Sequence, residues 1–423
     1  FGVINEFTGY LQPGNYEIFR DSAAAHGVLD QNKEFAFASG KFQVECYKEE
    51  CEANLRTPGL SGYQLLDLHD YLGQGTALIG VVDAFWRPKG YVTAAEFHRF
   101  SGPVVPLARL YSRVFKTTDK FGVDVEIANF GADAMAGAQL GWKIIEQDGT
   151  VAAQGNLNKR DIPIGKNIPL GKVSVDLSTL AAPREYKLDV SLAGTDIGND
   201  WNFWLYPAVV NAAPSPDVLV TTNWSDALAR LKQGSKVLFT PPPSSLGNNS
   251  PPLDNVPVFW NRLMNPKVGA MMGLLCDAKS AALAGFPTDV YCDWQWTEIV
   301  KNMKAINIDK APAELRPIVQ AIDDWNRNYR LGVVFECNVD SGRLVVCAAD
   351  IQSELDKRLV ARQLRRSLLD YMASDKFKPT VTLSEAQASG LFPGASPIPA
   401  RESAPQALPG DINENPTHPT TTP

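Results

Sequence analysis

The sequence has 423 residues, of which 44% are hydrophobic and 21% charged, and its formal net charge is -7. This composition is typical of a globular protein with about two to four domains. The acidic balance provides no basic stripe for phosphates, so nucleic acid is not an expected partner. No apolar run approaches the roughly 18 residues that a membrane span needs, so no membrane association is expected. Six cysteines without a CxxC spacing and four scattered histidines predict no metal site, and no cofactor is expected.

The first part of the chain reads as two helices followed by a single strand. The spacing of apolar residues predicts helices over 14–26 and about 33–56. A short and nearly continuous apolar run follows, formed by Tyr63, Leu65, Leu66 and Leu68. Such a run is typical of a strand buried on both faces, and we interpret it as one strand of a parallel barrel. Farther on, Thr93 and Glu96 form a capping box, which predicts a short helix ending near Phe100.

Polar side chains crowd the far end of the apolar run and the loop beyond it, namely Asp67, His69, Asp70 and Gln74. Barrel enzymes keep their active sites at the carboxyl ends of the strands, which makes these residues candidates for ligand contact. An ordinary structural explanation competes, because a strand-end Asp often caps the following loop and a neighbouring His is often a satisfied buried polar group. From the residues alone, both explanations stay open.

The barrel interpretation predicts that part of the barrel lies outside this sequence. A complete eight-stranded barrel takes about 250 residues, whereas residues 1–112 hold one convincing strand. Leaving a Leu-sized side chain in water rather than burying it costs roughly 1.5–3 kcal/mol. Several unpartnered ones therefore rival a domain's whole stability of about 5–15 kcal/mol. Because the chain also opens at Phe1 without a methionine, we expect a fragment whose missing strands precede it.

From residue 113 to residue 207 the apolar period changes to two. Alternating runs lie at 123–127, 140–144, 173–177 and 188–192. Asp148-Gly149 has the sequence of a hairpin turn. About six or seven short strands at this spacing predict an immunoglobulin-like β-sandwich.

From residue 208 to residue 378 strands and helices alternate. The series begins with a strand over 218–220, a helix over 225–233 and a strand over 236–240. This βαβ order predicts a flavodoxin-like α/β domain. Beyond it the composition drifts to Pro, Ser, Ala, Asn and Thr, which predicts a disordered tail over 379–423.

Several longer motifs follow one another along roughly residues 1–375. They are Arg56-Thr-Pro-Gly59, Gly62-Tyr-Gln-Leu-Leu-Asp-Leu-His-Asp70, Gly73-Gln-Gly-Thr-Ala77, Asp83-Ala-Phe85, Lys89-Gly90, Asn199-Asp-Trp201 and Ile322-Asp-Asp-Trp325. In this order they resemble the final barrel segment and the following domains of a subgroup of glycoside hydrolase family 2. Those are retaining β-glycosidases related to β-galactosidases and β-glucuronidases. The resemblance implies the last piece of a TIM barrel, then the sandwich, then an amidotransferase-like α/β domain.

The activity that the resemblance implies is hydrolysis of a β-linked, β-galactoside-like sugar with retention of configuration. Retaining chemistry needs two carboxyl groups about 5–5.5 Å apart. In this family both are glutamates of earlier barrel strands, so both are expected upstream of Phe1. Asn5-Glu6 imitates the acid/base motif, but it precedes the helix that leads to the last strand and is therefore out of place. No catalytic residue is assigned in this chain.

The resemblance further implies that this segment supplies one wall of the sugar pocket. Asp67 or Asp70 would accept hydrogen bonds from sugar hydroxyls, His69 and Gln74 would donate them, and Trp86 would stack on a sugar ring. An oligosaccharide or polysaccharide is the expected partner, and a periplasmic or extracellular location follows by analogy. Because related α/β modules commonly serve in assembly, a homo-oligomer is compatible with the resemblance.

Two further hypotheses stay open. In the first, the fragment stands alone as a carbohydrate-binding or assembly module without catalysis, and no barrel precedes Phe1. In the second, Asp67 and Asp70 are catalytic by themselves. The isolated chain would then cleave glycosides, and Asp67→Asn would abolish this activity.

Overall fold

The computed structural model describes residues 1–10, 12–72, 77–253 and 271–395. Two helices open the chain where they are predicted, α1 (Gly14–Ala25) and the long α2 (Asn32–Arg56). A short third helix, α3 (Ala94–Ser101), follows Thr93. The Thr93 hydroxyl accepts from the backbone N–H of Glu96, and the Glu96 carboxylate accepts from the backbone N–H of Thr93. The predicted capping box is confirmed.

The predicted barrel strand does not form in this chain, and the described residues contain no barrel. Residues 60–68 make no strand, and the nearest pairing is an isolated bridge between His69 and Val82. Three side chains of the apolar run are 43%, 61% and 42% exposed, namely Tyr63, Leu66 and Leu68. The physical reason is a lack of neighbours. A parallel strand is held by hydrogen bonds to strands beside it and by cover on both faces, and the described part of the chain places neither here.

Residues 104–206 form two sheets that share one hydrophobic core. One sheet has the order β1-β3-β8, the other has the order β2-β10-β9-β5-β6, and β4 pairs with β7. The bounds are β1 (Val104–Arg109), β2 (Val114–Lys116), β3 (Lys120–Asn129), β4 (Met135–Ala138), β5 (Gly141–Glu146), β6 (Val151–Asn156), β7 (Arg160–Ile162), β8 (Gly165–Asp176), β9 (Arg184–Ser191) and β10 (Gly198–Tyr206). The runs with period two lie along β3, β5, β8 and β9, and inward residues such as Ile127 and Leu188 are fully buried. Apart from the parallel pair β2 and β10, neighbouring strands run antiparallel.

The following unit is built on an eight-stranded sheet with the order β11-β12-β19-β18-β17-β14, to which β16 and β20 are added beside β18. Its strands are β11 (Val218–Thr221), β12 (Lys236–Phe239), β14 (Gly273–Cys276), β16 (Ile306–Asn307), β17 (Val319–Ile322), β18 (Leu331–Val339), β19 (Gly342–Cys347) and β20 (Thr382–Leu383). A separate pair joins β13 (Pro252–Leu253) to β15 (Met303–Lys304). The helices are α4 (Trp224–Leu231), α5 (Trp296–Val300), α6 (Leu359–Ala373) and α7 (Glu385–Gly390). Single 3-10 turns lie along the chain at η1 (Ile4–Glu6), η2 (Leu29–Gln31), η3 (Leu177–Thr179), η4 (Pro243–Ser245), η5 (Ala281–Leu283) and η6 (Pro393–Ala395).

The flavodoxin-like prediction for this unit needs correction, because the sheet is mixed. β11, β12 and β19 are parallel, whereas β18, β17 and β14 continue the sheet in antiparallel pairs. The cause is local. The short turn through Asp340 and Ser341 joins β18 to β19, and a connection of this length can only make an antiparallel hairpin. The disordered tail predicted from residue 379 also begins too early, since residues 382–395 form β20, α7 and η6.

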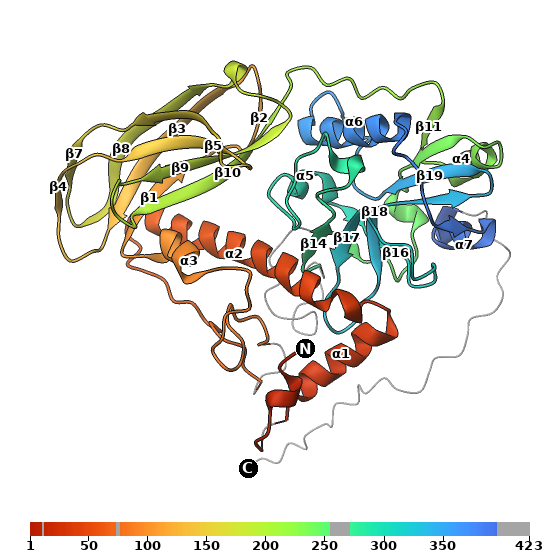
Figure 1. Ribbon diagram of the computed structural model, residues 1–423, viewed down its shortest axis with the longest axis horizontal. Helices are drawn as coiled ribbons and strands as arrows, with labels where there is room; N and C mark the ends of the chain where they lie inside the picture. Colours follow the sequence, from red (N-terminus) through yellow and green to blue (C-terminus); the bar gives the residue numbers. More distant parts are fainter. Residues whose placement is uncertain (11, 73–76, 254–270, 396–423) are drawn as a thin grey trace, which may run out of the picture.

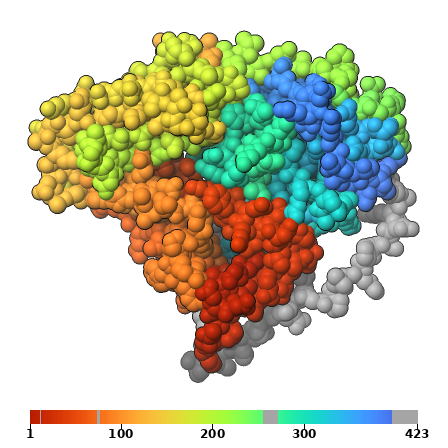
Figure 2. Space-filling view, in the orientation of Figure 1, coloured from red at the N-terminus to blue at the C-terminus, as the bar shows by residue number. Residues whose placement is uncertain are grey.

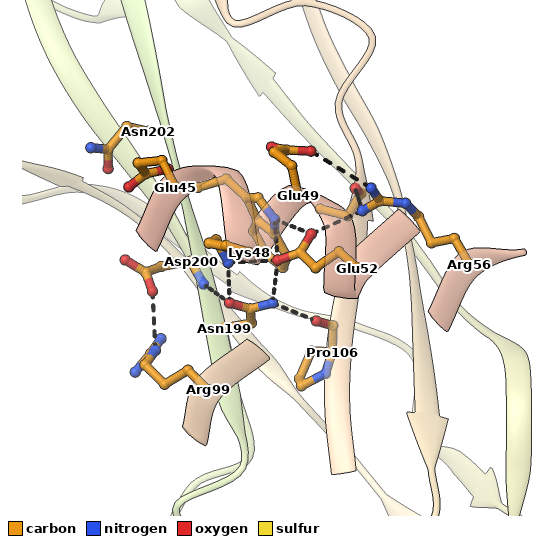
Figure 3. A network of polar contacts seen from close by, with 12 residues as sticks. Glu45, Lys48, Glu49, Glu52, Arg56, Arg99, Pro106, Asn199, Asp200 and Asn202 are labelled. Atoms are coloured by element: carbon orange, nitrogen blue, oxygen red, sulfur yellow. Dashed lines mark hydrogen bonds and ion pairs between the residues drawn. The ribbon is translucent and has the colours of Figure 1, made fainter. Parts of the chain in front are cut away.

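Helix α2 connects the sandwich with the α/β unit, and Figure 1 shows it running along the lower side of both. Its first half, through Ala38 and Phe42, belongs to the α/β core. Its second half carries Glu52, which has no exposed surface and accepts hydrogen bonds from four side chains (Figure 3). The donors and distances to the nearer Glu52 oxygen are Lys48 at 2.6 Å, Asn199 at 2.8 Å, Arg56 at 2.9 Å and Trp201 at 2.9 Å. The motif Asn199-Asp-Trp201 therefore fastens β10 to α2.

Candidate functional site

A cavity of about 740 Å³ lies where α1, α2, the loop over 77–91 and the edge of the α/β sheet meet. In Figure 2 the surface is hollowed between the N-terminal helices and the segment that follows them. Its apolar lining includes Phe19, Val28, Phe35, Phe42, Met271 and Ile322. Its polar lining includes Tyr16, Gln43, Asp70, Asp83, Lys89, Tyr91 and Asp323. A mostly apolar hollow with a few converging polar groups is the usual form of a small-molecule site.

Asp70 stands at the polar wall of the cavity and is 3% exposed. Its Oδ2 atom accepts a hydrogen bond from the Tyr16 hydroxyl at 2.7 Å. Its Oδ1 atom accepts from the Lys89 ammonium at 2.7 Å and from the backbone N–H of Gly80 at 2.9 Å. Burial and the neighbouring Asp70 carboxylate raise the pKa of Tyr16 well above its ordinary value, which keeps the phenol protonated as a donor.

Glycine is required at two positions beside this wall. A Cβ atom on Gly80 would lie 2.4–2.5 Å from backbone atoms of His69 and Asp70. A Cβ atom on Gly40 of α2 would lie 2.3 Å from the ring of Tyr91. The Tyr91 hydroxyl is 3.0 Å from both the Gly80 carbonyl oxygen and Gln43 Oε1, and burial raises the pKa of Tyr91. The glycines thus let the loop and Tyr91 lie directly on α2.

The predicted site residues do not all meet. Among them Asp70 lines the cavity. Asp67 is half-buried away from it, with a left-handed backbone at φ 58°. His69 packs against Trp86 outside the cavity, with ring centroids 4.5 Å apart, and Trp86 is 63% exposed. Gln74 lies outside the described residues.

Sequence reasoning missed three groups at this wall, Tyr16, Lys89 and Tyr91. Tyr16 is 54 residues from Asp70 along the chain, so no local spacing could relate the two. Lys89 stands in the Lys89-Gly90 motif, but nothing in its neighbourhood gave it a role. The structural explanation of Asp70 also holds in part, because its carboxylate fixes the backbone of Gly80.

The other two carboxylates of the cavity lining are held in ion pairs. Asp83 Oδ2 pairs with Arg87 at 2.8 Å, and Arg87 is also bidentate with Glu6 at 2.9 Å. Burial alone would raise the pKa of Asp83, but hydrogen bonds from Arg87 and Phe85 lower it below its ordinary value. Asp323 pairs with Arg327. Glu6, which imitates a catalytic acid in the sequence, is therefore a partner of Arg87 at the surface.

The described residues form neither a metal-binding cluster nor a membrane-spanning helix. Residues 1–10, 12–72, 77–253 and 271–395 contain no group of three or more His, Cys, Asp or Glu that could hold a metal ion. Among the helices of these same ranges, none is long and apolar enough to cross a membrane.

Two family models match parts of the chain. Residues 219–393 match a Domain of unknown function (DUF8487), and residues 119–207 match a Domain of unknown function (DUF8488). A search of curated proteins gave no match.

Among solved structures, the chain has a weak likeness to glycoside hydrolases. A Parabacteroides merdae β-glucuronidase is 14% identical over 32% of this chain and 21% of that chain, with a TM-score of 0.19. A putative β-galactosidase from Bacteroides fragilis is 15% identical over 33% and 24%, with a TM-score of 0.17. A family 123 glycoside hydrolase from Clostridium perfringens is 9% identical over 34% and 35%, with a TM-score of 0.17. The matched part spans at most about a third of these chains, and TM-scores of this size carry no argument.

Proposed function

We propose that this chain is the C-terminal part of a carbohydrate-active protein of the retaining β-glycosidase type, and that the wall around Asp70 contacts a β-linked, β-galactoside-like sugar. The observation that carries the proposal is Asp70 itself. The motif that ends at Asp70 resembles a sugar-pocket wall, and the carboxylate lines a cavity. A carboxylate can accept about four hydrogen bonds, and Asp70 accepts three from the described residues. A sugar hydroxyl would supply the fourth.

The proposed division of labour leaves hydrolysis to the longer parent protein. A retaining mechanism needs one carboxyl that donates a proton to the leaving oxygen and one that attacks the anomeric carbon. Each Asp of the cavity lining is ion-paired, with Lys89, Arg87 or Arg327. These pairs and their hydrogen bonds account for the three carboxylates, so we place both catalytic glutamates upstream, where the resemblance implies them.

The exposed apolar run supports the rest of this proposal. Neighbouring barrel strands would bury the exposed part of Tyr63, Leu66 and Leu68, which gains a fraction of the roughly 1.5–3 kcal/mol that full burial of an exposed Leu gives. We propose that they do so in the parent, where this run would be the last strand of a TIM barrel, followed by an immunoglobulin-like sandwich and an α/β domain. By the same resemblance we propose an oligosaccharide or polysaccharide substrate and a periplasmic or extracellular location.

One observation favours a second function. Trp86 is widely exposed, and its ring packs beside His69 at the surface. An exposed indole is a common platform for the apolar face of a sugar, and it would serve this purpose without any catalytic carboxyl. The alternative is a non-catalytic carbohydrate-binding or assembly module.

The decisive experiment compares the 423-residue chain with a version extended upstream to the start of its gene. Both are incubated with a panel of aryl β-glycosides, and NMR follows the configuration of the released sugar. Turnover by the extended protein alone, with retention, is the expected result. If neither form turns over but both bind sugar, the non-catalytic module is correct. If the short chain is equally active, both catalytic groups lie within it, and Asp67→Asn and Asp70→Asn then test whether they are these two.

A further inference from the structure

Lys89 is the cation nearest to Asp70, and it lies at the boundary between the protein and the cavity. Its Nζ atom is 2.7 Å from Asp70 Oδ1, and its side chain is 23% exposed. The Lys89 backbone N–H donates to the Val81 carbonyl oxygen at 3.4 Å. This hydrogen bond holds Lys89 in the loop over 77–91, from which its ammonium group lines the cavity. An ammonium carries three N–H donors. Asp70 accepts one of them, and in the described residues no second acceptor is recorded for Lys89.

We infer that Lys89 contacts the ligand and that the Asp70–Lys89 pair selects a neutral sugar over a uronic acid. This inference rests on the proposed function and names its substrate class. Lys89 would donate to one ring hydroxyl, and Asp70 would accept from a neighbouring hydroxyl through Oδ2, whose recorded donor is the Tyr16 phenol. A donor and an acceptor fixed side by side match two adjacent hydroxyl groups, each of which can donate and accept.

The charge of the cavity lining argues against an anionic ligand. Asp70 already neutralises Lys89. The two other carboxylates of the lining, Asp83 and Asp323, are paired with Arg87 and Arg327, which do not line the cavity themselves. The remaining lysine of the lining is Lys33, which is exposed to solvent. A screened surface cation contributes little to binding. The ammonium group of Phe1 also lines the cavity, and it donates to Asn32 Oδ1 at 3.0 Å. The carboxylate of a uronic acid would therefore enter a space with three carboxylates, in which the Lys89 and Phe1 ammonium groups already have acceptors and Lys33 is exposed.

The test measures binding of methyl β-D-galactopyranoside and methyl β-D-glucuronide to the full chain and to its upstream-extended form by isothermal titration calorimetry. We expect the neutral glycoside to bind more tightly than the uronide. We expect Lys89→Met to weaken the neutral glycoside about tenfold or more, since a hydrogen bond from a charged group is lost. The control Lys33→Met removes the other lysine of the same lining and should change the affinity less than about twofold.

Because Lys89→Met leaves the Asp70 carboxylate without its cation, the double variant Asp70→Asn with Lys89→Met, which removes both charges, is measured beside it. Thermal melting checks the fold of each variant. Tighter binding of the uronide would overturn the selectivity. Unchanged binding of the neutral sugar in both variants would overturn the contact while leaving the proposed function in place. If no sugar binds to either protein form, the proposed function fails, and this inference fails with it.

Discussion

The hydroxyl of Thr288 lies 3.0 Å from Oδ2 of Asp293, and this carboxyl group is buried beneath the junction of β10 with the α/β unit. The other recorded donors to Asp293 are the backbone and side-chain amides of Gln295, both at 3.1 Å. The Tyr206 hydroxyl at the end of β10 donates to Gln295. All these donors are neutral, so burial dominates and raises the pKa of Asp293 to about 8.

This shift predicts a stability that falls as pH rises. An unfolded Asp titrates near pH 3.9, at about its ordinary pKa, so between about pH 4 and pH 8 the folded protein holds a proton that unfolding releases. Asp293→Asn imitates the protonated group and should raise the melting temperature at pH 8 but not at pH 4. Thermal unfolding at pH 4, 6 and 8 measures this, with the exposed Asp375→Asn as the control. An unchanged pH slope in Asp293→Asn would contradict the assignment.

Substitution of Glu52 should lower the free energy of unfolding by a large amount. Its carboxylate is the common acceptor for Lys48, Arg56, Asn199 and Trp201. Burial would raise the pKa of Glu52, but the Lys48 charge and the hydrogen bonds outweigh burial and lower the pKa below its ordinary value. The ionised Glu52 therefore contributes to stability above the ordinary Glu pKa, and this contribution is lost on acidification. Glu52→Gln should cost about 3–5 kcal/mol, because it leaves the buried Lys48 ammonium without its ionised partner. Urea unfolding at neutral pH measures the cost. The exposed Glu50→Gln on the same helix should be nearly neutral, and equal effects of the two would refute the network's importance.

Gly40→Ala should destabilise the protein, although alanine is the better helix former. Alanine ordinarily gains up to about 1 kcal/mol of helix propensity over glycine. Here its Cβ would collide with the buried ring of Tyr91 at 2.3 Å, and the overpacking should cost about 1–3 kcal/mol. Chemical denaturation of Gly40→Ala should therefore show net destabilisation. Gly14→Ala in α1, where no atom lies within 4 Å of the new Cβ, should be tolerated; a loss of similar size there would argue against the collision.

Substitution of Trp86 should affect the proposed sugar binding without affecting stability. Trp86 is 63% exposed, so the ring contributes little to the core. If the indole is a sugar platform, Trp86→Ala should weaken binding of a soluble β-linked polysaccharide about tenfold, as loss of a stacking contact does, with an unchanged melting temperature. Affinity electrophoresis measures the binding. Tyr111→Ala, which removes an 88% exposed ring from the sandwich side, should leave migration unaltered.

Features set by neighbours in sequence were predictable. The capping box of Thr93 and Glu96 spans four residues, and the period of two along β3 spans ten. Asp340-Ser-Gly342 also has the sequence of a short turn, and a turn of this length between two strands requires an antiparallel pair, which the flavodoxin-like prediction did not take into account. The apolar run at Tyr63 failed because burial of a strand depends on partners that the run itself does not specify.

Of the residues that meet at the candidate site, only Asp70 was predicted from the sequence. Asp70 could be proposed because polar residues gather after an apolar run. Tyr16 comes from α1 and Lys89 from a loop 19 residues farther on, and both reach Asp70 only through tertiary folding. Side chains brought together by packing leave no periodic signal in the sequence.

Helix α2 has a mechanical consequence for the cavity. At 25 residues it is roughly 37 Å long, and its two halves are bound to different units, Glu52 to the sandwich and Phe42 to the α/β core. The described sandwich residues supply none of the cavity lining. The sandwich nonetheless fixes the orientation of α2, because a change in the position of Glu52 would tilt the helix and move the residues at its other end that line the cavity. A substitution in the sandwich that displaces Glu52 should therefore alter the shape of the cavity although it does not line it.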